Sequence, residues 1–466
     1  MRNMKYMWLL CAAILVAVTV SCNKEDEYFN EDYQSVPIVI DSIFLENYES
    51  QVPDRKVEFA RLGQLIRIEG KGLYGMKKVY VNGYDTYFNR AYVTDRSMLL
   101  QLNAKTPITD ADSTQRNKIR FVKDKAETTV DFLVRAASPS VTDISQTLPM
   151  PGETVTVYGT NLHETIKVTL PGDVVIEGDA ITCDEDGEWY SFVMPKGVTK
   201  GGCLYSEGAH GFAKTPDYFN ERRGVILDFD GTGVQGGWSA TYTSEDLTTD
   251  PLSSGRGNVV PVVPESVGGL NANANGKGWF TAGGEKGAWT DPSDNWERFY
   301  ELIPADTPVA EVALQFDVYV PQEWTTGMLE FTFQNNLSSY GYGSTETLNT
   351  KNIEYPTAVV WVPWLTDDFK KEPYKTTGWT TITIPLNTVG KYQDTEKEMT
   401  FGTVCADRAV ASYANFGMFL INNAVKISED LIYEPENFNQ MVYVDNWRLV
   451  PYKMETVPDY PEDEQE

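Results

Sequence analysis

The sequence predicts an all-β protein in which two small, tandem β-sandwiches are followed by a larger, jelly-roll-like β-sandwich. Short stretches with β-branched residues at alternate positions recur along the chain, and glycine-rich turns separate them. One strand-and-turn unit occurs twice without gaps, which indicates a repeated module. Helical periodicity is almost absent between the strands, and 466 residues are enough for several hydrophobic cores.

Residues 1–21 are expected to be a signal peptide. Arg2 and Lys5 precede an almost wholly apolar stretch, and Thr19-Val20-Ser21 comes directly before Cys22. Small residues in front of a cysteine resemble a lipobox, which implies cleavage at this point and lipidation of Cys22. A one-pass membrane anchor is the alternative, but the apolar stretch is short for a span and no basic stop follows it.

An acidic tether is expected over residues 22–35. Its cluster Asn23-Lys24-Glu25-Asp26-Glu27 resembles the export signal that sends lipoproteins of certain gut Gram-negative anaerobes to the outer face of the outer membrane. The alternative is an ordinary solvated spacer, because acidic runs are usually exposed. The expected location is therefore the cell surface, with the protein anchored to the outer membrane by lipid.

The repeated unit occupies residues 63–73 and 152–162. Each copy has a glycine turn, a strand with β-branched residues at alternate positions, and a second turn that a leucine closes. A proline-led apolar strand precedes each copy and another strand follows it. These residues resemble IPT/TIG modules, which have an immunoglobulin-like fold. The resemblance implies two immunoglobulin-like β-sandwiches, at 36–136 and 137–222.

The two front modules are expected to act as spacers that lift the last domain away from the membrane. An immunoglobulin-like sandwich hosts many roles, so the fold alone does not assign one. Ligand binding by these modules is the alternative hypothesis. In the first module Tyr84, Tyr87 and Tyr92 would supply an aromatic patch, although tyrosines scattered on strands usually pack.

The third domain is expected over residues 223–452, before an acidic, proline-bearing tail at 453–466. It opens with a strand at Val225 and continues through glycine-, serine- and asparagine-rich loops. Clear strands then follow at 312–320, 328–333, 357–362, 379–385, 416–422 and 442–450. Many strands with little helical pattern predict a two-sheet, jelly-roll-like sandwich.

Composition restricts the class of ligand. The formal net charge of −28 argues against nucleic acid and against anionic lipid or an acidic polysaccharide. The two histidines and the isolated cysteines do not form a zinc motif. Without Cys11 and Cys22, three cysteines remain: a Cys183–Cys203 bridge and free buried thiols are both compatible with the sequence.

The third domain holds most of the tryptophan, and this suggests flat apolar platforms for a neutral, hydroxyl-rich polysaccharide. One face of a sugar ring consists of C–H groups that lie against an aromatic plane, while the indole N–H remains free for a hydroxyl or water. The candidate glycan-binding residues lie in loops or at strand ends: Trp361, Trp364, Trp324, Tyr340, Tyr342, Trp289 and Trp296.

Strand alternation separates these candidates from tryptophans of the core. Trp361 faces away from Val360 and Val362, and Pro363 then ends regular pairing, so Trp364 falls where strand becomes loop. Trp379 is expected at the edge of the core. Trp447 is expected inside the core, on the same strand face as Tyr443 and Leu449.

The whole pattern resembles the surface glycan-binding protein B family, with a third domain like its xyloglucan-binding domain. The motifs that carry the resemblance are Trp361-Val362-Pro363-Trp364 and the stretches 377–386 and 444–452. The resemblance implies non-catalytic capture of a neutral plant-type glycan, a β-glucan or xyloglucan. It also implies partners: an outer-membrane glycan transporter with its lipoprotein lid, and surface glycoside hydrolases. It leaves the glycan open, because members differ in ligand.

Two other functions remain open on sequence alone. A surface glycoside hydrolase would need two carboxylates around the sugar; Asp317, Glu330, Glu297 and Glu301 are present but form no motif, and Glu330 is expected at the surface. A protein-binding adhesin would use exposed aromatics equally well.

No cofactor is expected. A structural calcium ion is an alternative if Asp228 or Asp230 approaches Asp445, where solvated aspartates at strand ends are just as compatible with the sequence.

Overall fold

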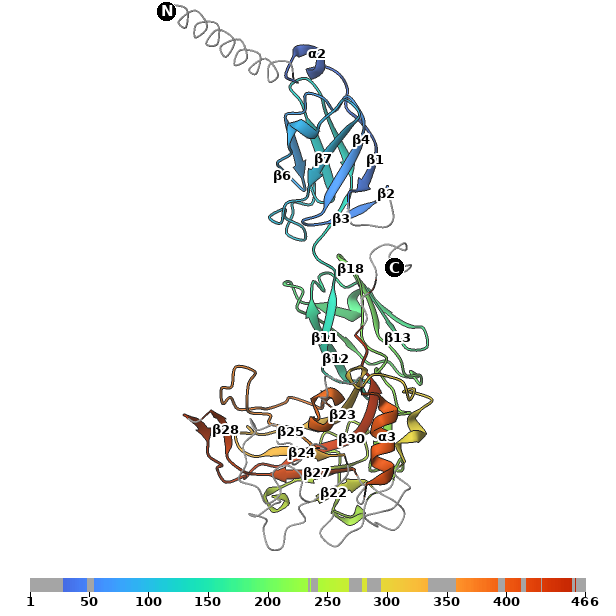
Figure 1. Ribbon diagram of the computed structural model, residues 1–466, viewed down its shortest axis with the longest axis vertical. Helices are drawn as coiled ribbons and strands as arrows, with labels where there is room; N and C mark the ends of the chain where they lie inside the picture. Colours follow the sequence, from blue (N-terminus) through green and yellow to red (C-terminus); the bar gives the residue numbers. More distant parts are fainter. Residues whose placement is uncertain are drawn as a thin grey trace, which may run out of the picture.

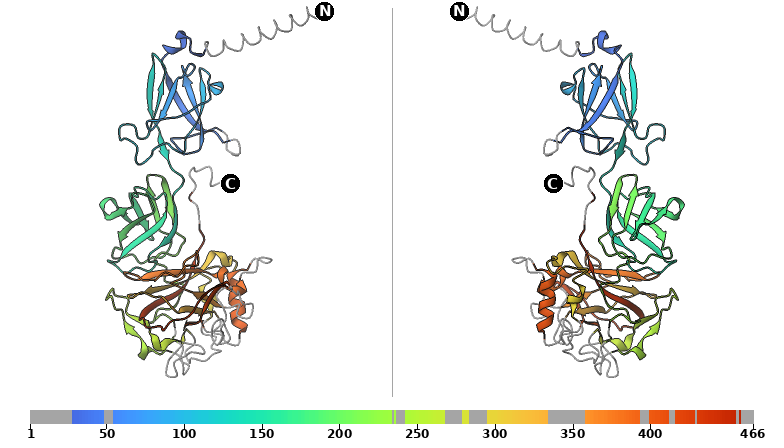
Figure 2. Two further views of the ribbon diagram at one scale, coloured as in Figure 1. Left: turned by 90° about the vertical axis from the view of Figure 1, so that its left-hand side faces the viewer. Right: turned by 90° about the vertical axis from the view of Figure 1, so that its right-hand side faces the viewer.

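The computed structural model is elongated, with three β-rich units following one another in chain order (Figure 1). It describes residues 28–47, 54–233, 235, 242–267, 279–282, 295–333, 358–392, 399–411, 416–428, 430–454 and 457. We call residues 28–136 module 1, 137–222 module 2 and 223–452 the third domain. Residues 28–35, expected in the tether, belong to module 1, because Tyr28 is buried in its core and Gln34 is also buried. Figure 2 shows module 2 between the other two units from both sides. The expected signal peptide and Cys22 lie outside the described residues.

Module 1 starts with a short helix, α2 (Glu31–Gln34), and contains two four-stranded antiparallel sheets with the orders β2-β1-β4-β7 and β6-β5-β8-β9. β3 and β10 form a separate parallel pair. The strands and the 3-10 helix are β1 (Val39–Leu45), β2 (Arg55–Lys56), β3 (Phe59–Arg61), β4 (Leu65–Lys71), β5 (Lys78–Val81), β6 (Tyr84–Asp85), η1 (Arg90–Tyr92), β7 (Ser97–Gln101), β8 (Lys118–Val122), β9 (Glu127–Asp131) and β10 (Leu133–Arg135).

Module 2 repeats this architecture with the sheet orders β11-β12-β16-β15 and β14-β13-β17-β18. Its elements are β11 (Ser140–Ile144), β12 (Thr154–Thr160), β13 (Lys167–Leu170), β14 (Val174–Glu177), η2 (Gly178–Ala180), β15 (Ile181–Cys183), β16 (Trp189–Val193), β17 (Tyr205–Gly208) and β18 (Gly211–Lys214). Cys183, Cys203 and Cys405 are free thiols, so the Cys183–Cys203 bridge is not formed.

The repeated glycines have the same structural role in both modules. Gly63 and Gly152 precede β4 and β12 with φ of 85° and 97°, a backbone conformation that L side chains rarely adopt. Inside the strands, a Cβ on Gly70 or Gly159 would lie 2.0 or 1.9 Å from a carbonyl oxygen of β1 or β11. In both modules this close approach coincides with a shift in strand register. The sequence repeat therefore encodes one turn and one bulge, twice.

The third domain is a sandwich of two sheets, with the orders β20-β21-β30-β23-β26 and β22-β27-β24-β25. β19 also pairs with β30, and β28 with β29. The strands are β19 (Val225–Leu227), β20 (Thr248–Thr249), β21 (Asn258–Val262), β22 (Trp279–Ala282), β23 (Val312–Tyr319), β24 (Met328–Thr332), β25 (Ala358–Trp361), β26 (Thr380–Pro385), β27 (Phe416–Ile421), β28 (Val425–Ser428), β29 (Leu431–Tyr433) and β30 (Val442–Pro451). The predicted all-β fold is confirmed.

Short helices cover the edges of the third domain. They are η3 (Ser244–Asp246), η4 (Pro264–Ser266), η6 (Trp296–Phe299), η7 (Val309–Glu311), η8 (Leu386–Thr388), η9 (Gly390–Tyr392) and α3 (Phe401–Val410). Helix α3 was not expected from the sequence. Thr400 caps its N-terminus by accepting a hydrogen bond from the Thr403 N–H, and Phe401 and Val404 bury its inner face in the core. Within the described residues, no helix combines the length and hydrophobicity that crossing a membrane requires.

Modules 1 and 2 meet through a polar clasp. Nη1 of Arg61 donates to the carbonyl oxygens of Ala136 and His210, at 2.8 and 2.9 Å. The backbone N–H of Ala136 donates to Nδ1 of His210, at 3.2 Å. Across the same junction, Arg116 binds both carboxylate oxygens of Glu164. His210 is 2 % exposed, so its ring is part of this clasp.

The clasp makes stability depend on pH. Burial, with the neighbouring His163 and Arg61, lowers the pKa of His210 from 6.5 to about 4. Between these values the unfolded chain binds more protons than the folded one, so stability is lost as the pH falls from about 6.5 to about 4. His210→Asn, which keeps an acceptor near Nδ1 but does not titrate, is expected to reduce the fall in melting temperature between neutral pH and the lower end of this range.

Differential scanning calorimetry of both chains checks this. If the melting temperature falls equally with pH in the wild-type protein and in His210→Asn, His210 is not the source of the pH dependence.

Module 2 and the third domain share an apolar cluster as well as polar contacts. Ala313 and Val450 of the third domain belong to the same buried apolar cluster as Val155 and Phe219 of module 2. Thr147 of module 2 lies against the outer face of the sheet that contains β30, β23 and β26. Its backbone N–H donates to the hydroxyl of Thr381 on β26, at 2.9 Å. The two units are therefore packed as one body.

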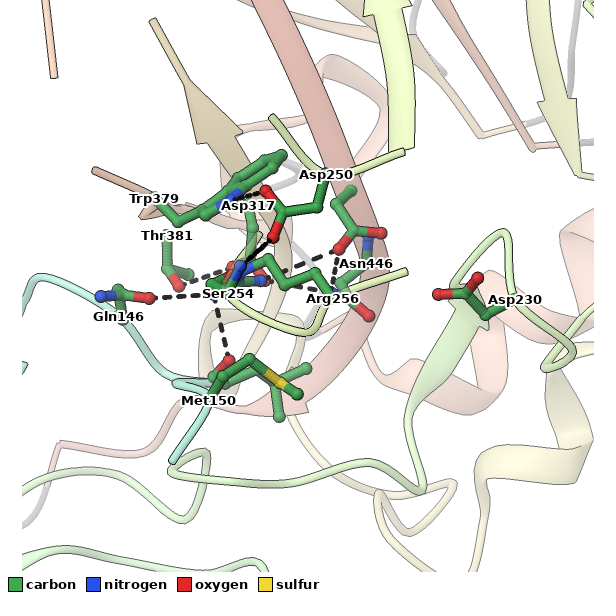
Figure 3. A network of polar contacts seen from close by, with 12 residues as sticks. Gln146, Met150, Asp230, Asp250, Ser254, Arg256, Asp317, Trp379, Thr381 and Asn446 are labelled. Atoms are coloured by element: carbon green, nitrogen blue, oxygen red, sulfur yellow. Dashed lines mark hydrogen bonds and ion pairs between the residues drawn. The ribbon is translucent and has the colours of Figure 1, made fainter. Parts of the chain in front are cut away.

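Buried charges complete this interface (Figure 3). Asp317 on β23 accepts from Nη2 of Arg448 at 2.9 Å and from Nη1 of Arg256 at 2.8 Å. Both arginines also reach module 2: Arg448 donates to the Thr147 hydroxyl at 2.6 Å, and Arg256 donates to Gln146 Oε1 at 2.9 Å. The Asp317, Arg256 and Arg448 side chains are no more than 1 % exposed. We call these five residues the junction network.

The carboxylates at this junction differ in charge. Burial alone would raise the pKa of Asp317, but Arg448 and Arg256 outweigh it and the pKa is lowered, so Asp317 is ionised. Asp445 lies 3.8 Å from Arg256. Burial raises its pKa well above the ordinary value, and the negative charge of Asp317 adds to this. Asp317 therefore pairs as an anion with both buried arginines, and Arg256 has a second carboxylate partner in Glu153 of module 2, whose Oε2 lies 3.4 Å from Nη2.

Candidate functional site

Two of the predicted platform residues serve the core instead. Trp324 and Trp364 are 0 % and 3 % exposed. Nε1 of Trp324 donates to the carbonyl of Thr326 at 2.6 Å, and Nε1 of Trp364 donates to the carbonyl of Gly327 at 2.7 Å. Both indoles thus secure the turn that leads into β24. The prediction that their faces are exposed is wrong, because the turn gives each N–H a buried partner and lets the rings pack inward.

Trp296 is also buried, at 1 % exposure. It starts the 3-10 helix η6, and its ring packs against Phe333 and Phe416. The guanidinium of Arg408, from α3, lies over the Trp296 ring, 3.7 Å from its centroid. The expectation of an exposed loop tryptophan is therefore wrong here. The helical spacing of Trp296 and Phe299, which are both buried, is the sequence signal for this inward packing.

Trp361, in contrast, is only partly buried. It ends β25, which is the last strand of its sheet in the described residues. Its pairing with Leu329 directs the ring to the face opposite Val360, as predicted. The ring makes edge contacts with Phe316 and Trp324, at centroid distances of 5.5 and 5.7 Å. The core thus fixes the orientation of a ring that is still partly open to solvent.

Tyr374 extends this aromatic surface. Its ring centroid lies 5.5 Å from that of Trp361, with the planes at 88°. Its backbone pairs with that of Trp324, which holds the segment beside the sandwich. Burial raises the pKa of the Tyr374 hydroxyl to about 12, so the hydroxyl remains protonated at neutral pH. We call Trp361 and Tyr374 the aromatic corner. Tyr374 was not among the residues predicted from the sequence.

Exposed polar residues flank Trp324 and Tyr374 in the chain. Gln322 and Glu323 are exposed just before Trp324, and Lys375 is exposed just after Tyr374. Amide, carboxylate and ammonium groups supply the donors and acceptors that sugar hydroxyls need, while the rings supply apolar contact. The predicted platforms Tyr340, Tyr342 and Trp289 lie outside the described residues. They remain predictions.

A second exposed ring lies on the neighbouring hairpin. Phe369 is 53 % exposed and has a φ of 60°, which is rare for a residue with a side chain. Its carbonyl accepts a hydrogen bond from the Tyr433 hydroxyl at 2.9 Å, and Tyr433 packs edge-on against Trp364. The alternation pattern did not identify Phe369, because it lies at the tip of a turn rather than on a strand.

Two of the four candidate carboxylates are buried. Asp317 is bound in the junction network, and Glu330, expected at the surface, is 0 % exposed. Glu297, within η6, and Glu301, two residues after its end, are both exposed. Neither buried carboxylate reaches solvent, where a polysaccharide would bind.

The aspartates considered for calcium have other contacts. Asp228 Oδ1 accepts three backbone N–H groups of its own turn, and Asp230 Oδ1 accepts from Asn258. Asp445 faces Arg256. Among the residues that the structure describes, no group of three or more His, Cys, Asp or Glu side chains is placed to hold a metal ion.

Comparison with known families assigns the third domain. The model of the surface glycan-binding protein B xyloglucan binding domain matches residues 219–451. The chain belongs to the surface glycan-binding protein B family. The match begins within the last residues of module 2 and covers both sheets of the sandwich. The family and its structural neighbours are glycan-binding proteins rather than enzymes, and the family name implies a location at the cell surface.

Similar proteins agree with this family and fold. An "IPT/TIG domain-containing protein" of Bacteroides ovatus is 25 % identical over 209 residues, which is 45 % of this chain and 40 % of that protein. The chain therefore matches less than half the length of this curated relative. The crystal structure of the surface glycan-binding protein PbSGBP-B from Prevotella bryantii superposes with a TM-score of 0.62 at 20 % identity, over 89 % of this chain and 99 % of that one.

Proposed function

We propose that this protein is a non-catalytic, lipid-anchored receptor at the outer face of the outer membrane that captures a neutral polysaccharide of the β-glucan or xyloglucan type. The observation that carries this proposal is the match of the whole third domain to a glycan-binding family. The net charge of −28 supports a neutral ligand. The lipobox-like sequence before Cys22 supports the lipid anchor.

The geometry supports stacking at the aromatic corner. A sugar face on an indole removes roughly 100 Å² of apolar surface, or about 2.5 kcal/mol before losses. Two or three such contacts, after the cost of ordering the ligand, correspond to a Kd between about 1 mM and 10 μM. Weak sites of this kind work through long ligands and neighbouring receptors, which anchoring on a surface provides.

Capture fits into an uptake system as its first step. A polysaccharide held at the surface needs an enzyme that cuts it and a transporter that imports the fragments. We therefore propose surface glycoside hydrolases and an outer-membrane glycan transporter with its lipoprotein lid as partners. The support for this is the family membership.

Gel electrophoresis of the soluble mature chain (residues 23–466), with polysaccharide cast into the gel, tests this function. Xyloglucan, mixed-linkage glucan, galactomannan, xylan and starch form the panel, and reducing ends are measured after incubation with each. We expect retardation by a β-glucan or xyloglucan without new reducing ends. New reducing ends would indicate a hydrolase, and no retardation by any member would contradict glycan capture.

A further inference from the structure

Module 1 carries the two most exposed aromatic rings among the described residues. Tyr87 is 78 % exposed and Tyr92 is 60 % exposed. Both follow β6, and Tyr92 ends the 3-10 helix η1. Neither side chain makes a ring contact or hydrogen bond to the part of the chain that the structure describes. Single exposed rings are common on protein surfaces, so only what lies beside them can indicate a ligand.

A cavity opens beside Tyr87. Its volume is about 430 Å³, and it is lined by Lys77, Lys78, Asp85, Thr86, Tyr87, Phe88, Asn89 and Arg90. Pockets for small ligands start at roughly 300 Å³, so this one has room for a sugar unit or two. The lining combines an exposed aromatic ring with charged and amide side chains, which is the combination that sugar rings and hydroxyls require.

Contacts around the cavity hold its polar groups in place. Oδ1 of Asn89 accepts a hydrogen bond from the backbone N–H of Ala91 at 3.0 Å. This bond fixes the orientation of the Asn89 amide group at the start of η1. The guanidinium of Arg90 lies 4.5 Å from the ring centroid of Phe29 and forms no hydrogen bond to a described residue. The NH2 group of Asn89 and the guanidinium of Arg90 therefore donate no hydrogen bond to the described residues.

Both lysines in the cavity lining are paired with carboxylates, while Arg90 lies over the Phe29 ring. Lys78 forms an ion pair with Asp85, and Lys77 forms one with Asp124. An anionic ligand would have to compete with these carboxylates for each lysine. A neutral ligand with many hydroxyls can instead bond to both members of a pair. The paired lysines, together with the net charge of −28, favour a neutral glycan over a phosphate group or an anionic membrane surface.

We propose that this cavity, with Tyr87 and Tyr92, is a second glycan-binding site. It rests on the proposed function, since it takes units of the same neutral polysaccharide that the third domain captures. The two sites lie at opposite ends of the molecule (Figure 1). A long polysaccharide that occupies both gains affinity from linkage, whereas a short oligosaccharide does not. Module 1 is then a part of the receptor and not only a spacer.

Chemical protection of the tyrosines tests the site in the intact mature chain. Tetranitromethane nitrates exposed tyrosines, and peptide mass spectrometry gives the rate at each position. With the polysaccharide that retards the chain in gels, at ten times its Kd, nitration of Tyr87 and Tyr92 is expected to slow about tenfold. Tyr158 in module 2, which is 42 % exposed on a strand, is the internal control and keeps its rate.

A double variant gives an independent readout. Tyr87→Ala with Tyr92→Ala is expected to weaken binding of the long polysaccharide about tenfold, with an unchanged melting temperature because both side chains are exposed. Unchanged nitration rates and affinity, in a chain that the polysaccharide still retards, would overturn the second site and leave the proposed function intact. Equal protection of Tyr158 would also overturn it, by showing non-specific coating. A chain that no polysaccharide retards would refute both proposals together.

Discussion

Asp317→Ala is expected to destabilise the protein by about 3–5 kcal/mol, the usual cost of removing one partner from a buried ion pair. In the structure this carboxylate pairs with Arg256 and Arg448, whose side chains are 1 % and 0 % exposed. Without it, the buried Arg448 guanidinium would lose its ion-pair partner, and Arg256 would retain Glu153 at 3.4 Å. Because this interface joins both units, the loss is expected to affect module 2 and the third domain together.

Urea unfolding followed by tryptophan fluorescence measures this effect. Asp368→Ala is the matched control: it also removes an aspartate from an ion pair of the third domain, with Lys370, but that aspartate is 57 % exposed. The control is expected to stay within about 0.5 kcal/mol of wild type. A loss below about 1 kcal/mol for Asp317→Ala would show that the arginines find other partners and that the junction network is dispensable.

The junction network also determines which fragments of the chain are suitable for binding experiments. A fragment of residues 223–452 alone would expose Gln315, Arg448 and the apolar Ala313 and Val450, which module 2 covers in the intact chain. Such a fragment is expected to be less stable than the intact chain. Binding experiments therefore need the mature chain.

Trp361→Leu is expected to weaken polysaccharide binding at least about tenfold, since one stacked sugar contributes up to about 2.5 kcal/mol and a leucine offers no flat face. Leucine retains part of the apolar packing against Phe316 and Trp324 but loses ring contacts, so the melting temperature is expected to fall modestly while the chain stays folded. Trp379→Phe is the control. Trp379 is 2 % exposed, and its Nε1 donates to Asp250 at 3.0 Å, so the change is expected to lower stability but not affinity.

Calorimetric titration of the three chains with the same polysaccharide separates these effects. Equal affinities for the wild-type protein and Trp361→Leu would remove Trp361 from the site and leave the residues outside the described structure as candidates.

The architecture was predictable because it depends on local rules. Alternating β-branched residues gave the main strands of the third domain, and the repeated glycines marked positions where a side chain would collide with the paired strand. Alternation also placed Trp361 opposite Val360 and put Trp447, at 0 % exposure, in the core. Each of these properties follows from the period of a strand.

The positions of several aromatic side chains were harder to predict, because these residues lie where the two-residue alternation of a strand is interrupted. In β30 the pairing shifts between Asp445 and Arg448, and Asn446 takes a φ of 53°. This bulge moves Tyr443 to the opposite face from Trp447, where it stacks on Tyr319, although strict alternation puts both on one face. Trp324 and Trp364 also lie outside regular strands. Only the tertiary structure shows the carbonyl groups that accept hydrogen bonds from their indole N–H groups.

Buried polar groups were also hidden from sequence. Gln315, Asp317 and Arg448 alternate with apolar residues, which is the pattern of a strand face in contact with water. Only the contact with module 2 explains their burial. Helix α3 was missed for a related reason: its inner face, Phe401, Val404, Cys405 and Arg408, has helical spacing, but a buried arginine conceals the stripe.

The central claim is that this chain binds a neutral polysaccharide without cutting it. The most direct measurement is isothermal titration calorimetry of the mature chain (residues 23–466) with xyloglucan and mixed-linkage glucan. Starch serves as the control, and reducing ends are measured in the same cells. We predict saturable binding to one of the two β-glucans, with a Kd of about 10 μM to 1 mM and no new reducing ends. Absence of binding to every polysaccharide of the wider panel, or release of reducing ends, would contradict the account.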